Sequence, residues 1–502
     1  MKKLLAFYFL FNIFSSYSQE NEELIHQLRA TIEELKEFVA IPNDALYIED
    51  IQKNIDWLSI KFKQRGFQTT ILETESSPLF FAEFPLDENK PTILFYMHFD
   101  GQSVDASKWN QENPYEIVLK KQNGTNWEQL EWDNLNKEID MNLKLFGRST
   151  SDDKGPIVMF LNAIDLLQKN KKEIPFNVKV ILDSEEEKSS KPLPKAVSDN
   201  RELLKANFLI INDGPVHYSE KPTLIFGCRG IASLSITTFG PLKPQHSGHY
   251  GNYAPNPVFR LAHLLSSMKD ENGKVVIEGY YDGIEIDEST STILKNVPDD
   301  IEIIHNTLAI NSPETVGSYY QESLQYPSLN VRGISSGWVG KQARTIVPER
   351  AIAEIDIRLV PEIEGKKLIE LIKNHIQNQG YYITSEEPTL EERKTHSKIV
   401  MLKEGSITDP FRTDLDNNYG LWIESVLNKT FNEDVVKIRI MGGTVPIAPF
   451  INELKIPAFI LPMVNPDNNQ HSPNENLKIE LISYGLKTFY NLLSTPLIIQ
   501  KN

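Results

Sequence analysis

Short apolar runs rich in β-branched residues alternate with segments of helical periodicity towards both ends of the chain. The apolar runs are Thr92–Met97, Asn177–Leu182, Asn207–Ile211 and Pro457–Met463. Apolar residues spaced three and four positions apart predict helices over Glu22–Phe38, Asn54–Gly66, Gly155–Gln168 and Ile479–Leu493. Strands without a polar face are typical of a sheet that helices cover on both sides. We therefore expect an α/β domain with a central, mostly parallel sheet.

The middle of the chain has a different pattern. Gly230–Phe239 and Ala351–Leu359 alternate apolar and polar residues, as strands with one solvated face do. Further expected elements are a helix at Asn256–Met268, a strand at Ser328–Gly333 and a helix at Gly365–Gln379. This pattern predicts a smaller α+β domain inserted into the α/β domain. The expected boundaries are 19–226 and 403–502 for the α/β domain and 227–402 for the insertion.

The N-terminus has the pattern of a secretory signal peptide. Lys2 and Lys3 precede an apolar run, Leu4–Phe14, and small or polar residues follow at Ser15–Ser18. The run is too short to span a bilayer comfortably. We expect residues 1–18 to be a signal peptide and the mature protein to be exported, either periplasmic or secreted. An exported protein whose only cysteine is Cys228 has no internal disulfide.

The charge of the chain argues against two classes of partner. Lys and Arg number 52 against 69 Asp and Glu, which gives a formal net charge of −17. So acidic a surface repels the phosphates of nucleic acids and anionic lipid headgroups. We expect neither nucleic acid nor membrane to be a partner.

Acidic residues and histidines recur where the predicted buried strands end. His98 and Asp100 follow the first strand, and the Glu185–Glu187 run follows the second. Asp213 follows the third strand, and His471 lies in the loop after the fourth. Each of these features alone has a structural explanation, such as a solvated charge run. Their recurrence at the same end of four strands predicts a ligand site, because open α/β sheets bind ligands at their carboxyl edge.

The order of the motifs identifies a resemblance that covers nearly all of the expected mature chain. The chain resembles the carnosinase-like branch of the co-catalytic zinc peptidases, a family that includes aminoacylases and glutamate carboxypeptidases. The motifs are Gly147–Pro156, Glu186-Glu187, His246–Gly251, Ile346-Val347-Pro348 leading to Arg358, Gly442-Gly443-Thr444 and His471–Glu475. The resemblance implies a catalytic α/β domain with an inserted lid and dimerisation domain, and hence a homodimer.

The resemblance also implies a site for two divalent metal ions. Asp152 would bridge them, and the other ligands would be His98 and Asp213 on one side and Glu187 and His471 on the other. Imidazole and carboxylate ligands suit zinc, with manganese or cobalt as alternatives.

Further roles follow from the same resemblance. Asp100 would orient His98, and Glu186 would be the general base that activates a metal-bound water. In the inserted domain, His246 would stabilise the oxyanion in the partner subunit's site, and Arg358 would bind the terminal carboxylate of the substrate. Thr345 and Thr444 match positions that contact substrate.

Three residues depart from the family pattern. Ser149 and Ser189 stand where glycine is usual, and Met441 stands where many relatives have glutamate. The last difference leaves the preference for peptides over other N-acyl amino acids open.

These observations predict an exported peptidase that hydrolyses dipeptides or short peptides with a free C-terminal carboxylate. One alternative is an N-acyl-amino-acid amidohydrolase, which uses the same metals and base. A periplasmic peptide-binding protein is an alternative from another class, although such a protein needs no base beside its metal ligands.

Overall fold

The computed structural model describes residues 22–136 and 138–498, so the predicted signal peptide (1–18) lies outside the described residues. The described chain forms two compact units. The first unit comprises residues 22–226, 413–437 and 449–498, and the second comprises Gly227–Arg412 and Ile438–Ala448.

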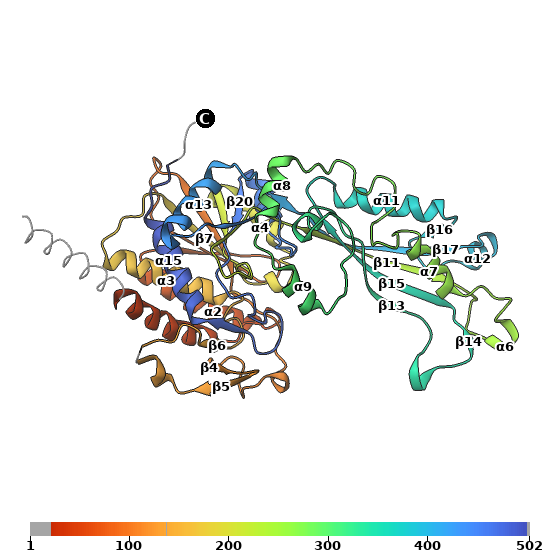
Figure 1. The fold of residues 1–502 in the computed structure, drawn as a ribbon, viewed down its shortest axis with the longest axis horizontal. Coiled ribbons are helices and arrows are strands. Elements are labelled where there is room, and N and C mark those ends of the chain that lie inside the picture. Colours follow the sequence, from red (N-terminus) through yellow and green to blue (C-terminus); the bar gives the residue numbers. More distant parts are fainter. Residues whose placement is uncertain (1–21, 137, 499–502) are drawn as a thin grey trace, which may run out of the picture. The chain divides into compact units, whose positions relative to one another are not determined.

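The first unit is built on an eight-stranded sheet in the order β1-β2-β7-β3-β8-β20-β9-β19. Figure 1 labels β7 and β20 of this sheet. Its central strands β7, β3, β8 and β20 run parallel, which confirms the predicted mostly parallel sheet and the α/β fold class. The strands are β1 (Gln68–Leu72), β2 (Leu79–Glu83), β3 (Thr92–His98), β7 (Asn177–Asp183), β8 (Phe208–Ile211), β9 (Thr223–Ile225), β19 (Val436–Ile438) and β20 (Ala458–Ile460).

Helices pack on this sheet through apolar faces. They are the helix over residues 22–39, α2 (Ile48–Gln64), α3 (Lys154–Lys169), α4 (Leu193–Asp199), α5 (Arg201–Leu204), α13 (Asn418–Phe431), α14 (Ala448–Leu454) and α15 (Ile479–Ser494). The helices α3 and α15 lie side by side (Figure 1). Gly485 of α15 permits this approach, since a Cβ there would lie 2.2 Å from the Met159 sulfur. This packing fixes the position of the N-terminus of α3, which lies just after Asp152.

A second, four-stranded sheet in the first unit was not predicted. It has the order β21-β6-β4-β5, with β4 (Val118–Asn123), β5 (Asn126–Leu130), β6 (Lys144–Phe146) and β21 (Asn476–Lys478). β6 runs directly into the Gly147–Pro156 motif, and β21 directly follows Glu475. Because Phe146 pairs with Asn476, this sheet brings two distant motifs of the sequence together.

Two predicted elements of the first unit differ in length from the observed ones. The predicted strand Pro457–Met463 is only Ala458–Ile460, because Pro462 has no N–H with which to continue the ladder. α2 begins at Ile48 instead of Asn54, because the charged residues of its first turn do not contribute to the apolar periodicity.

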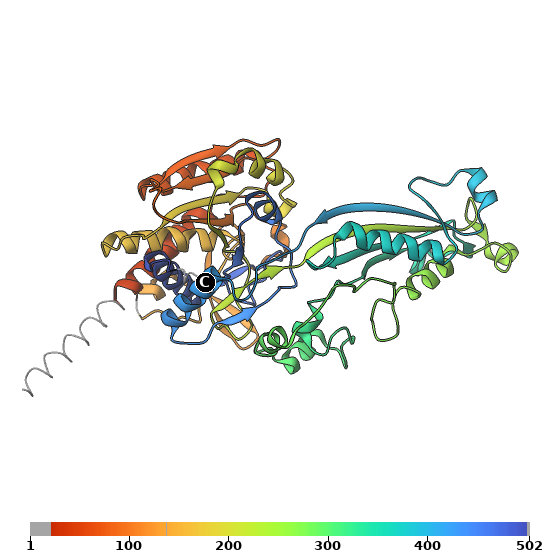
Figure 2. The same ribbon diagram turned by 90° about the horizontal axis from the view of Figure 1, so that it is seen from above.

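The second unit is an α+β fold around a five-stranded sheet in the order β13-β15-β11-β17-β16. One face of the sheet packs on α7 and α11 in a single apolar core, and Figure 2 shows α11 lying along the strands. β15 is buried at alternate positions, as its sequence predicted. The strands of the sheet are β11 (Gly230–Phe239), β13 (Asn330–Ser335), β15 (Arg350–Leu359), β16 (Tyr382–Thr384) and β17 (Ile399–Thr408).

The remaining elements of the second unit are short strands and helices. Two strand pairs are β10 (Gly227–Cys228) with β18 (Phe411–Arg412) and β12 (Gln245–His246) with β14 (Ile346–Val347). The helices are α6 (Ser247–Tyr250), α7 (Pro257–Ser266), α8 (Glu288–Lys295), α9 (Ile301–Leu308), α10 (Tyr320–Ser323), α11 (Gly365–Asn378) and α12 (Leu390–Thr395).

The second unit extends beyond the segment expected from sequence. The expected boundary at residue 402 falls inside β17, which continues to Thr408 as a partner of β11. Residues 438–448 also belong to this unit, because Met441 pairs through its backbone with Gly227 and Arg229.

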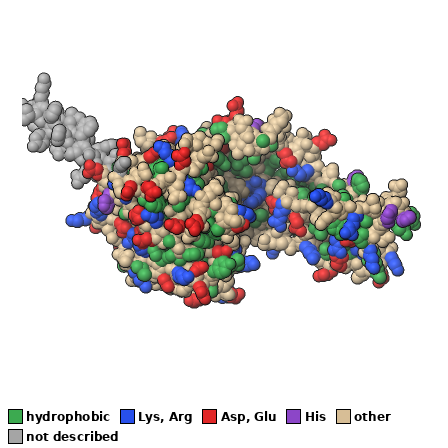
Figure 3. Space-filling view, turned by 90° about the horizontal axis from the view of Figure 1, so that it is seen from below, with side chains coloured by type: hydrophobic (Ala, Val, Ile, Leu, Met, Phe, Trp, Pro, Cys, Tyr) green, Lys and Arg blue, Asp and Glu red, His purple; other side chains and the backbone are tan. Residues whose placement is uncertain are grey.

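Two surface properties bear on the expected partners. Among the described helices, none combines the length and the apolar character needed to cross a bilayer. Acidic and basic side chains are interspersed over the face in Figure 3.

Candidate functional site

His98 and Asp152 form the centre of the polar cluster in the first unit. His98 ends β3 and is fully buried, and its Nε2 lies 2.9 Å from Asp152 Oδ1. Asp152 stands in the loop before α3 and is 5% exposed. The parallel strands and the N-terminal end of α3 thus place an imidazole against a carboxylate.

Two groups of potential metal ligands share Asp152. His98, Asp152 and Asp213 form the first group, and Asp152, Glu187 and His471 form the second. Within each group the ligand atoms lie within 4.8 Å of one another. These are the two ligand sets that the family resemblance implied.

The electrostatics of these groups fit bound cations. Burial and the charge of Asp152 raise the pKa of Glu187 to about 8, and the same two causes raise that of Asp213 to about 6. Asp152 Oδ2 is buried and accepts no well-formed hydrogen bond, although His471 Nε2 lies 3.2 Å away. Carboxylates crowded in this way are stabilised by positive charge, and imidazole with carboxylate is a donor set for zinc, manganese or cobalt.

Asp100 orients several residues of the site at once. One carboxylate oxygen lies 3.3 Å from His98 Nδ1 and accepts the backbone N–H of Glu186 at 3.0 Å. The other accepts the backbone N–H of Glu187 at 3.1 Å. Asp100 therefore fixes both the ring of His98 and the turn that carries the two glutamates.

Glu186 belongs to neither ligand group, although it is adjacent to Glu187. It begins a short 3-10 turn, Glu186–Lys188, directly beyond β7. Burial, opposed by His98 and reinforced by Asp213, raises the pKa of Glu186 well above its ordinary value. A carboxylate beside two groups of potential metal ligands, and outside both, is the geometry expected of a general base.

Glu475 holds the loop of Asp152 against the loop of His471. Its buried carboxylate pairs with Arg148 Nη1 at 2.7 Å and accepts the backbone N–H groups of Ser149, Ser151 and Asp152, each at 3.0 Å. It also accepts the hydroxyl of Ser151 at 2.8 Å. Glu475 is the last residue of the His471–Glu475 motif, and the sequence alone predicted no role for it.

Two other features of the site escaped sequence reasoning. Gln102 donates from Nε2 to Glu187 Oε2 at 2.6 Å, and only its position soon after His98 could have indicated this. The loop of His471 is fixed by buried asparagines, since Asn465 donates to Asn476 and Asn476 donates to the Asp467 carbonyl.

The site residues predicted in the second unit form two separate groups. His246 of β12 pairs with Ile346 of β14, next to Thr345, whose carbonyl accepts the backbone N–H of Ser247. Both His246 and Thr345 are exposed.

Arg358 and Thr444 form the other group. Arg358 Nη1 donates to Thr444 Oγ1 at 2.8 Å. The position of Arg358 is set by β15, where it lies opposite Ile231 of β11.

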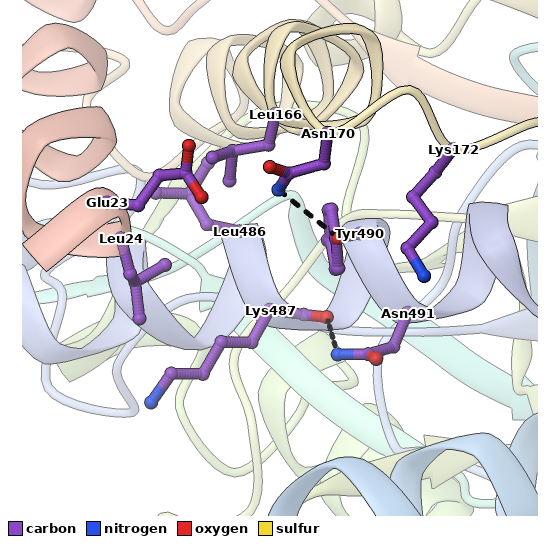
Figure 4. A pocket seen from close by; sticks show the side chains of 9 residues that line it. All are labelled: Glu23, Leu24, Leu166, Asn170, Lys172, Leu486, Lys487, Tyr490 and Asn491. Atoms are coloured by element: carbon purple, nitrogen blue, oxygen red, sulfur yellow. Dashed lines mark hydrogen bonds between the residues drawn. The ribbon is translucent and has the colours of Figure 1, made fainter. Parts of the chain in front are cut away.

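A surface pocket in the first unit is unrelated to these groups. It lies among the helix over residues 22–39, α3 and α15 (Figure 4). The lining residues are Glu23, Leu24, Leu166, Asn170, Lys172, Leu486, Lys487, Tyr490 and Asn491, and none of them is a predicted site residue.

Comparison with known proteins relates this chain to the M20 peptidases. Residues 226–383 match the peptidase dimerisation domain of the M20 family. The chain is 27% identical to the Cys-Gly metallodipeptidase DUG1 of Candida albicans, over 91% of this chain and 92% of the relative. It is 25% identical to the Beta-Ala-His dipeptidase of Mus musculus, over 95% of each chain.

A solved structure agrees with these relatives. The M20 family metallo-carboxypeptidase Sso-CP2 from Sulfolobus solfataricus is 26% identical, with a TM-score of 0.74 over 92% of this chain and 98% of that one. These likenesses confirm the resemblance that the motifs indicated, and the chain is a peptidase homologue of the M20 family.

Proposed function

We propose that this protein hydrolyses the amide bond of dipeptides or short peptides that have a free C-terminal carboxylate. The observation that carries the proposal is the pair of ligand groups sharing Asp152, with Glu186 beside them and outside both. Two relatives are named as dipeptidases, for Cys-Gly and for Beta-Ala-His, which supports this substrate class.

The residues of the first unit divide the chemistry among them. Two divalent ions held by the two groups, zinc or alternatively manganese or cobalt, would supply Lewis acidity towards the water and the substrate carbonyl. Glu186 takes the proton of the attacking water and returns it to the leaving amine. Asp100 keeps Glu186 and His98 in place through the hydrogen bonds described above.

Arg358 supplies the preference for a free C-terminus. A guanidinium can bind a carboxylate through two parallel hydrogen bonds, and Thr444 steadies Arg358 from one side. An amidated C-terminus would leave this cation without its partner.

His246 acts in the active site of a second subunit under this proposal. His246 pairs with Ile346 of β14, and β14 lies just before Arg350, the first residue of β15. Arg358 lies near the last residue of β15. The eight residues from Arg350 to Arg358 span roughly 26 Å of strand at about 3.3 Å per residue. One dipeptide cannot bridge that length, so His246 and Arg358 of one subunit serve different sites.

The second unit offers a surface for such a homodimer. β13 is an edge strand of the sheet, and its Ile334 is 64% exposed. Phe259 on α7 is 67% exposed. An open edge strand with exposed apolar residues can pair with a second copy, and the match to a peptidase dimerisation domain supports this.

The remaining parts of the proposal concern export and the competing substrates. The pattern of residues 1–18 supports export to the periplasm or beyond. The relatives are hydrolases, which argues against the peptide-binding protein, whereas the N-acyl-amino-acid amidohydrolase remains the competing activity.

A chelation experiment tests the proposed activity. The purified protein is stripped with a chelator, reloaded with zinc, manganese or cobalt, and assayed with dipeptides and with N-acetyl amino acids. Dipeptide cleavage that the chelator abolishes and a metal restores is expected. Faster cleavage of N-acetyl amino acids would favour the amidohydrolase, and no metal-dependent cleavage of either class would refute the proposal.

A further inference from the structure

Two arginines of the second unit are held together by one threonine. Thr444 Oγ1 donates to the carbonyl oxygen of Arg229 at 2.7 Å and accepts from Arg358 Nη1 at 2.8 Å. Arg229 immediately precedes β11, and Arg358 lies opposite Ile231 of that strand. The sequence motifs pointed only to Arg358, so Arg229 is an unassigned cation next to a predicted carboxylate-binding residue.

Among the residues that the structure describes, no acid forms an ion pair with either guanidinium. The partners of the two guanidiniums are the carbonyl of Tyr326, which accepts from Arg229 Nη2 at 2.7 Å, and the hydroxyl of Thr444. The neighbouring acid Glu362 pairs instead with Arg412 and Arg439. Neither guanidinium therefore has an ion-pair partner, and the charge of Asp356 acts on Arg229 only as a minor influence.

Arg229 carries an unused hydrogen-bond donor. Arg229 is only 7% exposed, and its Nε is buried without a hydrogen-bond partner. Burial and the charge of Arg358 lower the pKa of Arg229 to about 10, so it remains protonated at neutral pH. A buried cation with an unsatisfied donor beside a second cation is costly unless an anion binds there.

The backbone partner of Arg229 adds no charge to the pair. Arg229 donates its N–H to the carbonyl of Met441 at 3.1 Å, and Met441 donates its N–H to Gly227. The two positive charges of Arg229 and Arg358 therefore receive no charged partner from Met441. One carboxylate would balance one of these charges, and two carboxylates would balance both.

We propose, resting on the proposed function, that Arg229 and Arg358 together bind a C-terminal residue carrying two carboxylates. Arg358 binds the α-carboxylate, and Arg229 attracts the side-chain carboxylate. The preferred substrates therefore end in glutamate or aspartate.

Three substrates that differ only in charge test this preference. The metal-loaded enzyme is assayed with Ala-Glu, Ala-Gln and Ala-Gln amide, which carry two, one and no carboxylates. Ala-Glu should exceed Ala-Gln in kcat/KM by about 10- to 100-fold, the usual worth of one charge-assisted hydrogen bond. Equal rates for Ala-Glu and Ala-Gln would overturn the proposal and leave the metal-dependent peptidase intact. Absence of metal-dependent cleavage of all three would instead refute the proposed function.

Variants assign the preference to Arg229. Arg229→Met should bring the Ala-Glu to Ala-Gln ratio close to one, and Arg229→Lys should keep part of it. The matched control is Arg350→Met, which removes an arginine at the other end of β15 that is paired with Glu387 and should leave the ratio unchanged. An equal loss for both substrates in Arg229→Met would show a purely structural role and overturn the assignment.

If Arg229→Met does not fold, product inhibition of the wild type tests whether the enzyme recognises the side-chain carboxylate. Free glutamate should inhibit more strongly than free glutamine, since the two differ only in the charge that Arg229 is proposed to recognise. Equal inhibition constants would overturn the proposal.

Discussion

The carboxylate of Glu475 accepts the backbone N–H of Asp152 at 3.0 Å across a separation of 323 residues. Glu475 stands four residues after His471, so one side chain links the residue shared by both ligand groups to the loop that supplies another ligand. The buried charge of Arg148, 2.7 Å from the same carboxylate, completes the link. The geometry of the proposed metal site therefore depends on a residue that belongs to neither ligand group.

Glu475→Gln should weaken metal binding as well as stability. The amide can accept through only one oxygen and leaves Arg148 buried without a counter-charge, which costs about 3–5 kcal/mol of the free energy of unfolding. Metal affinity should fall roughly 10- to 100-fold, as with other residues that orient metal ligands. Denaturant unfolding and titration of the stripped protein with metal measure the two effects.

Glu34→Gln is the matched control for this variant. Glu34 forms a similar, nearly buried pair with Arg65 at 2.8 Å, outside both ligand groups. The control should lose stability and keep its metal affinity. If Glu475→Gln also kept wild-type metal affinity, the positioning role of Glu475 would be wrong.

Asp152→Ala and His471→Ala should differ in metal stoichiometry. Asp152 belongs to both ligand groups, whereas His471 belongs to one. Removing Asp152 should therefore abolish tight binding of both ions, and removing His471 should mainly weaken one. Elemental analysis after gel filtration provides the count, and equal losses in the two variants would exclude Asp152 as a shared ligand.

Mixed dimers should reveal whether His246 serves the partner's site. One subunit carries His246→Ala and the other Glu186→Gln, so each homodimer should be nearly inactive. In a cross-subunit arrangement one site of the mixed dimer holds both intact residues, and about half of the wild-type activity returns. Mixed dimers that form, as shown by differently tagged subunits, and stay inactive would refute this role.

Ser189→Gly should stabilise the protein. Ser189 ends the Glu186–Lys188 turn at φ 75°, in the left-handed region, which costs a residue with a Cβ about 1 kcal/mol. Its hydroxyl makes no hydrogen bond among the described residues, so nothing offsets that cost. Thermal or denaturant unfolding should show a gain of about 1 kcal/mol.

Ser425→Gly provides the contrast for Ser189→Gly. Ser425 is exposed in the middle of α13, and glycine there should lower stability by about 0.5–1 kcal/mol. A destabilised Ser189→Gly would show that the turn does not bear the expected strain. The family's usual glycine at this position would then need another explanation.

Much of the fold was predictable because the decisive signals are local. The apolar runs Thr92–Met97 and Asn177–Leu182 become the parallel strands β3 and β7, each one residue longer than predicted, and the alternating Gly230–Phe239 becomes β11 with the same bounds. The ligand residues could be placed at one edge of the sheet for the same reason. His98, Glu187, Asp213 and His471 each follow a strand that the pattern revealed, whereas Asp152 was placed only in the loop before a helix.

The parts that sequence reasoning missed depend on contacts between distant segments. β6 and β21 have three residues each, too few to show a periodicity, and they pair across more than 300 positions. The bonds of Glu475 with Arg148 and Asp152 arise from that pairing. The roles of Gln102 and Arg229 likewise follow from contacts with residues distant in sequence, Glu187 and Thr444.

Glu186→Gln, with metal content measured in the same sample, tests the central claim most directly. The variant keeps the shape of the side chain and removes the proton acceptor. The account predicts a loss in kcat of roughly 10²- to 10⁴-fold for dipeptide cleavage, with two bound metal ions retained. Near-normal turnover by a metal-loaded Glu186→Gln enzyme would contradict the account.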